Sequence, residues 1–148
     1  MPLLLTALTT SPGIPGAGGA NYPATRLACA QAWAAAAQAW AAGIVPPSPT
    51  VAAAAATLAT ALDAAFASAS AAAAMESAFL AFANGVGSGM VGYLAVAPPA
   101  PIGFATMFLT SESTRQGGVN KVANALDTWM RTGTSYQLVV PFAVVPWS

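Results

Sequence analysis

The sequence predicts a mainly α-helical protein: a bundle of three to four alanine-rich helices, with an extended N-terminal arm and a short C-terminal β-element. Three observations support this prediction. Alanine, the strongest helix former, dominates residues 24–84. Apolar side chains in that stretch recur at spacings of three, four and seven residues, as they do on one face of a helix. After residue 133, β-branched and aromatic residues become frequent, which is typical of strands.

Composition divides the chain into three parts. Residues 1–23 are rich in proline, glycine and threonine, and they predict an extended arm because proline and glycine oppose a long helix. Residues 24–133 predict the helical domain, which contains an embedded polar loop at residues 110–120. Residues 134–148 predict a C-terminal strand or arm.

The first helix is expected from residue 24 to Gly43, and it contains a duplicated heptad, AQAWAAA followed by AQAWAAG. A seven-residue repeat returns each side chain to nearly the same helix face, so Trp33 and Trp40 share one face. Gly43 suits a left-handed C-terminal cap. The two indoles are the only large apolar feature of this helix, and we therefore expect both to be buried against another helix.

Ser48 and Pro49 predict the start of a second helix, with serine as N-cap and proline in the first turn. Its apolar stripe loses phase at residues 68–70, which predicts a break and a third helix over residues 71–83. One long bent helix is the alternative. Asn84 followed by glycine predicts the end of this region, and the glycine-rich stretch after it fits either a resumed helix or an extended chain.

The C-terminal third mixes strand and helix signals. Residues 102–109 have β character, whereas residues 120–131 are amphipathic and predict a helix that Gly133 closes. Residues 134–148 predict a strand, but Pro141 and Pro146 lack the backbone donor that a central strand needs. We therefore predict an edge strand or β-arm there.

Charged residues make up 5% of the chain and sum to zero, against about 25% in an average soluble domain. Such a surface predicts cover by other subunits or by lipid. No cluster of Lys or Arg is available for phosphate contacts, which argues against nucleic acid as a partner. Two long uncharged stretches suggest a membrane protein, but prolines and glycines interrupt both, and neither has a basic flank.

The sequence offers little for catalysis. It has no histidine and a single cysteine, Cys29, which we interpret as a packed apolar side chain. Asp63 and Glu76 are separated by the predicted helix break, and we interpret both as exposed helix positions. Ser113 has no histidine to activate it, and the glycine-rich GVGSG lacks the Lys-Ser/Thr ending of a phosphate loop. We expect no enzymatic activity, no cofactor and no metal.

Apolar residues at both ends of the chain predict contacts between subunits. An edge strand presents unpaired backbone groups that a second chain can complete. The alternative is that both ends fold back on their own helices. The candidate interface residues are Leu3, Leu4, Leu5, Leu8 and Ile14 in the arm, Trp33 and Trp40 in the first helix, and Tyr136, Leu138, Val140, Phe142 and Trp147 near the C-terminus.

Three segments together resemble a known class of proteins: VAAAAATLATALDAAFASASAAAAMESAFLAFANG, YLAVAPPAPIGF and VANALDTWMRTGTSYQLVVPF. The pattern, which covers roughly residues 50–142, resembles small alanine-rich virion structural proteins of contractile-tailed bacteriophages. The resemblance implies a non-enzymatic neck, collar or tail component, assembled in the host cytoplasm with copies of itself and other virion proteins. Two alternatives stay open: a small membrane protein such as a phage holin, and a secreted helical-hairpin protein.

Overall fold

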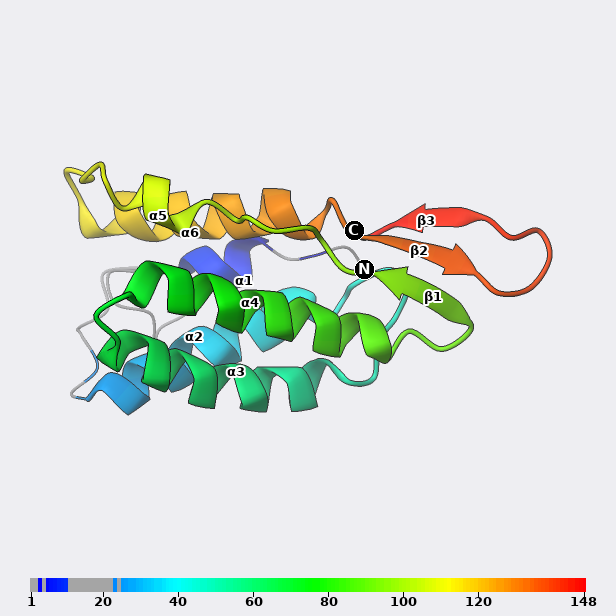
Figure 1. Ribbon diagram of the computed structural model, residues 1–148, viewed down its shortest axis with the longest axis horizontal. Coiled ribbons are helices and arrows are strands. Elements are labelled where there is room, and N and C mark those ends of the chain that lie inside the picture. The colour runs from blue at the N-terminus through cyan, green and yellow to red at the C-terminus, as the bar shows by residue number, and fades with distance from the viewer. Residues whose placement is uncertain (1–2, 4, 11–22, 24) are drawn as a thin grey trace.

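The computed structural model describes residues 3, 5–10, 23 and 25–148, and within them it is mainly helical with a small antiparallel sheet, as the sequence predicts (Figure 1). The elements are α1 (Leu5–Thr10), α2 (Arg26–Ala41), α3 (Val51–Ala67), α4 (Ala71–Ser88), β1 (Tyr93–Val96), α5 (Phe104–Met107), α6 (Arg115–Met130), β2 (Thr134–Gln137) and β3 (Val144–Pro146).

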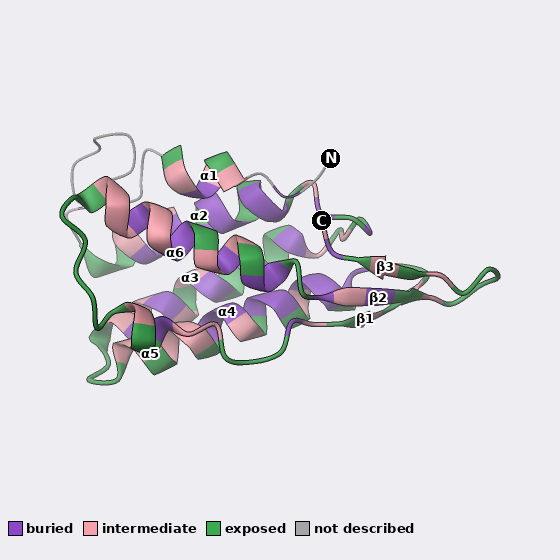
Figure 2. Ribbon diagram, turned by 90° about the horizontal axis from the view of Figure 1, so that it is seen from above, coloured by how far each residue is buried: buried purple, intermediate pink, exposed green. Residues whose placement is uncertain are grey.

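The long helices form one elongated body, and the sheet extends from one of its ends (Figures 1 and 2). Helix α3 packs between α2 and α4, while α1 packs against both α2 and α6, and α5 lies on α4. Figure 2 shows that the helices turn their buried residues toward one another. The alanines allow the helices to approach closely, whereas the larger apolar side chains supply most of the free energy of burial, about 1.5–3 kcal/mol each.

The tryptophan face of α2 lies in this core. Trp40 is completely buried and Trp33 is 9% exposed, which confirms the predicted burial of both indoles. The indole Nε1 of Trp40 donates a hydrogen bond of 3.0 Å to Asp127 Oδ1 on α6. Burial of this polar ring is possible because its single donor is satisfied. The largest fully buried side chains are Trp40, Trp147, Phe79, Phe82, Phe104, Leu8, Leu58, Leu62, Leu126, Met130 and Val86.

The predicted break at residues 68–70 is confirmed, since α3 ends at Ala67 and α4 begins at Ala71. The predicted start at Ser48 is wrong: α3 begins at Val51. The Ser48 hydroxyl donates 2.6 Å to the carbonyl of Val86, and the Thr50 hydroxyl donates 2.7 Å to that of Gly85. Both hydroxyls therefore bond to the C-terminal turns of α4, a distant partner that local cap rules do not include.

Helix α4 continues to Ser88, beyond the end predicted at residues 83–85. Its glycines allow close packing rather than ending the helix. A Cβ placed on Gly85 would lie 3.0 Å from the Cβ of Ala54 on α3. A side chain at residue 85 would crowd α3 at this approach, so close packing here offsets the low helix propensity of glycine.

The N-terminal arm is not extended over Leu5–Thr10, which form α1, so that part of the prediction is wrong. Leu3 and Leu8 are buried in the chain's own core, and Leu5 packs at its edge. Gln116 on α6 donates 3.0 Å to the carbonyl of Thr9. Apolar contacts to α2 and α6 therefore stabilise a six-residue helix that would not form alone. The remaining arm candidates, Leu4 and Ile14, lie outside the described residues.

The β character predicted for residues 102–109 is wrong, because Phe104–Met107 form the short helix α5. The carboxylate of Glu76 on α4 accepts backbone N–H groups from Ile102, Gly103 and Phe104 at 3.0, 3.3 and 3.3 Å. A distant carboxylate thus satisfies donors at the helix start, where orphan N–H groups need acceptors. The Phe104 ring meets Phe79 edge to face at 5.9 Å.

The polar loop predicted at residues 110–120 is shorter than expected, because α6 already begins at Arg115. Thr114 is its N-cap, and the threonine hydroxyl accepts the backbone N–H of Gly117 at 3.0 Å. The polar residues 115–120 suggested a loop, but they form the first turns of α6. The side-chain cap at Thr114 fixes the start of this helix.

The sheet has the strand order β1–β2–β3, with both pairs antiparallel. The sequence left residues 85–97 open between helix and extended chain, and Tyr93–Val96 form β1. Strand β2 is central, so the edge-strand prediction is wrong for Thr134–Gln137. Pro141 lies in the turn between β2 and β3, and Pro146 lies on the edge strand β3, in agreement with the positions that proline tolerates in sheets.

Candidate interaction surface

The three strands and the turn at residues 138–143 form a projection that we call the sheet arm. The turn is its distal end, away from the helices (Figures 1 and 2). No Asp, Glu, Lys or Arg occurs in residues 89–101 or 132–148. The sheet arm is therefore an uncharged structure joined to one end of the helical body.

The inner face of the sheet arm is tightly held by Trp147, which is 1% exposed. Its Nε1 donates 2.8 Å to the hydroxyl of Ser135, the one polar side chain that is completely buried among the described residues. A Cβ on Gly133 would lie 2.5 Å from the indole Cδ2. The last residue, Ser148, exchanges two backbone hydrogen bonds with Val45 in the α2–α3 connector. The base of the arm is thus fixed to the helices.

The outer face of the sheet arm is apolar and open. The register aligns Leu94 with Tyr136, and Tyr136 with Val144, so these three residues form one row across the sheet. Leu94 is 60% exposed, and the other two are also exposed. Since side chains alternate between the faces of a strand, this row lies opposite the face that carries Ser135.

The distal turn adds exposed apolar side chains. Val140 is 77% exposed and Phe142 is 63% exposed, and Leu138 and Val139 are exposed too. Phe142 has φ = 55°, a left-handed conformation that is an outlier for a bulky residue. Large exposed apolar patches are associated with contacts to other proteins, membranes or ligands.

The structure places the sequence-predicted candidates in two groups. Tyr136, Leu138, Val140 and Phe142 come together on the sheet arm, where they are exposed. The residues that belong instead to the chain's own core, and are not available as a surface, are Leu3, Leu8, Trp33, Trp40 and Trp147.

Sequence reasoning missed the part of the surface that β1 contributes. Leu94 and Val96 alternate with Tyr93 and Ala95, and the first two are exposed while the others are partly buried. The sequence YLAV was the available signal for a strand. Because glycines precede this segment and prolines follow it, so short a segment was not recognised as a strand. Val91, Val139 and Val144, in or beside the sheet arm, are further exposed apolar residues that were missed.

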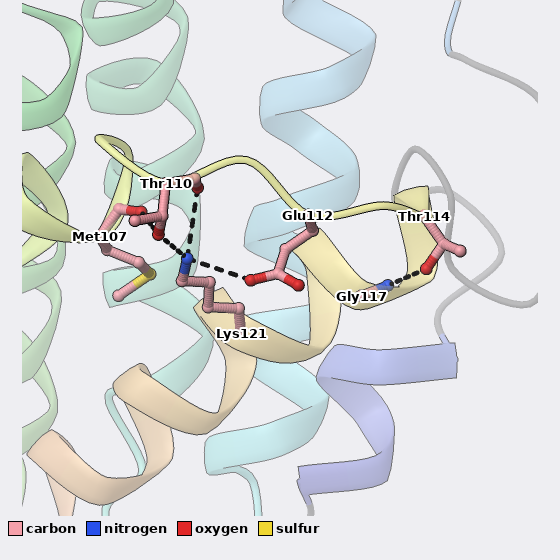
Figure 3. Close-up of polar contacts among 6 residues, drawn as sticks. All are labelled: Met107, Thr110, Glu112, Thr114, Gly117 and Lys121. Atoms are coloured by element: carbon pink, nitrogen blue, oxygen red, sulfur yellow. Dashed lines mark hydrogen bonds and ion pairs between the residues drawn. The ribbon is translucent and has the colours of Figure 1, made fainter.

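A pocket of about 340 Å³, lined by both polar and apolar side chains, lies where α6 begins. Figure 3 shows Lys121 reaching toward Thr110 and Glu112. Its Nζ lies 3.1 Å from Glu112 Oε1 and donates to the carbonyl and the hydroxyl of Thr110. Lys121 is therefore already engaged in holding the α5–α6 connector on α6. Ser113 also lines this pocket, and the sequence has no histidine to activate it.

Several other titratable groups are also engaged in structural contacts. Arg26 donates 2.7 Å to Asp63, and this hydrogen bond raises the pKa of the guanidinium. Glu76 binds the backbone ahead of α5, so its interpretation as a merely exposed helix position is wrong. Burial raises the pKa of the Cys29 thiol, because removal from water disfavours the thiolate. Among the described residues no three His, Cys, Asp or Glu side chains are grouped to hold a metal.

Comparisons with known proteins give no match to a family model, to a curated protein or to a solved structure. Within the described part of the chain, none of the helices has both the length and the apolar character needed to cross a bilayer.

Proposed function

We propose that this protein is a non-enzymatic structural subunit of a tailed-phage virion, in the neck, collar or tail, and that it assembles in multiple copies through the sheet arm. The observation that carries the proposal is an uncharged, apolar sheet arm that projects from a helical body. Exposure of so many large apolar side chains costs solubility in an isolated chain. Their contact with other subunits removes that cost, because it takes the apolar area out of water.

The conformation of the arm supports the same conclusion. Phe142 holds a left-handed backbone conformation while its ring is exposed. Such strain, of order 1–3 kcal/mol, is typical of positions that serve a function beyond folding. Trp147 and the Val45–Ser148 hydrogen bonds fix the base of the arm. A surface that is already ordered loses less entropy on binding than a flexible one.

The virion assignment follows from the resemblance of the three quoted sequence segments, and the charge content agrees with it. Charged residues are 5% of the chain, which suits a subunit enclosed by neighbours. Several titratable side chains of the described residues are also held in structural contacts, such as Lys121 with Glu112. These contacts leave protein–protein assembly as the activity best matched to the surface.

Fractionation of cells that express the gene during phage production tests the proposal. Particles purified on a density gradient should contain the chain in several copies per virion, measured by quantitative mass spectrometry. Recovery in the membrane fraction would favour the holin alternative, and recovery in the medium free of particles would favour a secreted protein. Either result contradicts a virion subunit.

A further inference from the structure

The two edges of the sheet differ in their capacity to accept another strand. The strand order leaves β1 and β3 as the edges. Exposed edges invite pairing with another chain, and proteins commonly guard them with proline or with charge. Strand β3 contains Pro146, whereas β1, with the sequence YLAV, contains neither proline nor charge. The unguarded edge is therefore β1.

The hydrogen-bond pattern identifies which groups of β1 face outward. The Leu138 N–H donates 3.0 Å to the carbonyl of Gly92. Bonded positions alternate along an antiparallel strand, so Leu94 and Val96 also bond to β2. Ala95, between them, therefore directs its N–H and its carbonyl away from the sheet. Tyr93 directs its carbonyl the same way, while its N–H donates to Met90 in the preceding turn.

The other edge strand, β3, offers fewer backbone donors to a further strand. Trp147 donates its N–H to the carbonyl of Gly133, and Gln137 donates to that of Ala143. By the same alternation, Val144 and Pro146 face outward on β3. Pro146 has no N–H, so one of the two outward positions of this short strand cannot donate. Strand addition is consequently better supported at β1.

We infer that β1 pairs antiparallel with β1 of a second copy of this chain and so joins two sheets into one of six strands. This inference rests on the proposed function, which requires contacts between copies. A two-fold axis at Ala95 lets the two alanines exchange both of their backbone hydrogen bonds. The carbonyl of Tyr93 then accepts the N–H of Ala97 of the second copy, and the symmetric bond forms as well.

The side chains fit this register. With the axis at Ala95, Leu94 lies opposite Val96 of the second copy, and Val96 lies opposite its Leu94. Both residues are exposed and apolar, and directly opposed apolar pairs stabilise a sheet. The exposed row that begins at Val144 and passes through Tyr136 then continues across the contact. A two-fold contact uses one surface twice, and this surface is complementary to itself.

Charge favours a second copy over a partner of another kind. The sheet arm has no charged residue, so two copies approach without like-charge repulsion. A partner selected by charge, such as nucleic acid or an acidic peptide, finds no counterion on this edge. Strand addition instead takes its affinity from main-chain hydrogen bonds and its specificity from alternate side chains, and β1 supplies both to a copy of itself.

Two charged double variants test the register. In Leu94→Lys/Val96→Lys each lysine faces a lysine of the second copy, which disfavours pairing. In Leu94→Lys/Val96→Glu each lysine faces a glutamate. Sedimentation equilibrium should detect dimers for the wild-type chain and for the Lys/Glu variant, and monomers for the Lys/Lys variant. Both positions are exposed, so circular dichroism and the melting temperature should match the wild type at low concentration, where dimer formation does not contribute to stability. A monomeric Lys/Glu variant, or a dimeric Lys/Lys variant, contradicts the inference.

A cross-link test can capture a dimer that associates too weakly for sedimentation. Leu94→Cys/Val96→Cys in a Cys29→Ser background places opposed thiols at the Cα separation that a disulfide requires. With oxidised glutathione as the oxidant, two thiols become one disulfide while glutathione is reduced, and a covalent dimer should appear. Val144→Cys in the same background, exposed on the other edge, should stay monomeric. Absence of the first dimer, or a stronger Val144→Cys dimer, contradicts pairing at β1.

The experiments distinguish failure of the virion proposal from failure of the β1 pairing. If the β1 variants give the contradicting results while the wild-type chain is still found in particles, pairing at β1 is wrong and the virion role stands. If β1 pairs as inferred but the chain is absent from particles, the virion role is wrong and the dimer stands.

Discussion

Trp147 anchors the sheet arm to the helical body, and its removal should destabilise the whole chain. The indole is 1% exposed and donates 2.8 Å to the hydroxyl of Ser135. A Cβ on Gly87 of α4 would lie 3.1 Å from the ring, and one on Gly133 would lie 2.5 Å from it. The ring thus fills a space that two glycines leave open between α4 and β2.

The structure sets the expected size of the effect. Trp147→Ala removes the ring and leaves a cavity, for which buried aromatic side chains give a loss of about 3–5 kcal/mol in the free energy of unfolding. Trp147→Phe keeps most of the ring but loses the hydrogen bond. The Ser135 hydroxyl can still donate to Met90 Sδ, 3.2 Å away. The phenylalanine variant should therefore cost about 1–2 kcal/mol.

Urea unfolding followed by far-ultraviolet circular dichroism measures both variants without relying on the deleted fluorophore. Val140→Ala, at a residue that is 77% exposed, is the control and should change the free energy by less than about 0.5 kcal/mol. A Trp147→Ala variant within about 1 kcal/mol of the wild type would refute the anchoring role. So would equal losses for the alanine and phenylalanine variants, because the reasoning assigns most of the effect to ring volume.

Three further predictions concern the helical body. Glu76→Ala should lower the free energy of unfolding in urea by about 1–3 kcal/mol, because three backbone N–H groups lose their acceptor. Glu76→Gln should lower it less, and equal losses of free energy for the two variants would contradict the account. Alkylation of Cys29 by iodoacetamide should shift to higher pH in the folded chain than in urea, because burial raises the thiol pKa; coincident pH profiles would show that burial does not act on it. Iodide should quench the folded chain weakly, since all four indoles are at most 9% exposed, and strong quenching would contradict their burial.

The helical body could be predicted because its signals are local. The seven-residue repeat places Trp33 and Trp40 on one face, and the phase change at residues 68–70 marks a real break. The predictions were wrong where the hydrogen-bond partner of a side chain lies far away in the sequence. Ser48 reads as a local N-cap, but its hydroxyl bonds to the end of α4. Glu76 reads as an exposed position, but it satisfies the backbone that begins α5. Neither partner is adjacent in the sequence.

The candidate surface was predictable only in part. The exposure of Tyr136 follows from the period of a strand, whereas Leu138 and Val140 are exposed because they lie in the turn beyond β2. The sequence could not distinguish them from Trp147, which is equally apolar but turns inward to Ser135. The strand β1 was obscured because a four-residue element between glycines and prolines has too few alternations to stand out. Its pairing with β2 joins residues more than 35 positions apart, which no local pattern reveals.

The most direct test of the central claim compares incorporation of sheet-arm variants into particles. Leu138→Lys/Val140→Lys places two charges on exposed positions of the distal turn, and Leu109→Lys places one on the α5–α6 connector, where Leu109 is 82% exposed. Quantitative mass spectrometry of particles purified from cells that supply each variant measures copies per virion. We predict wild-type incorporation for Leu109→Lys and loss of incorporation for the double variant, with unchanged melting temperatures for both. Equal incorporation of the double variant would contradict assembly through the sheet arm.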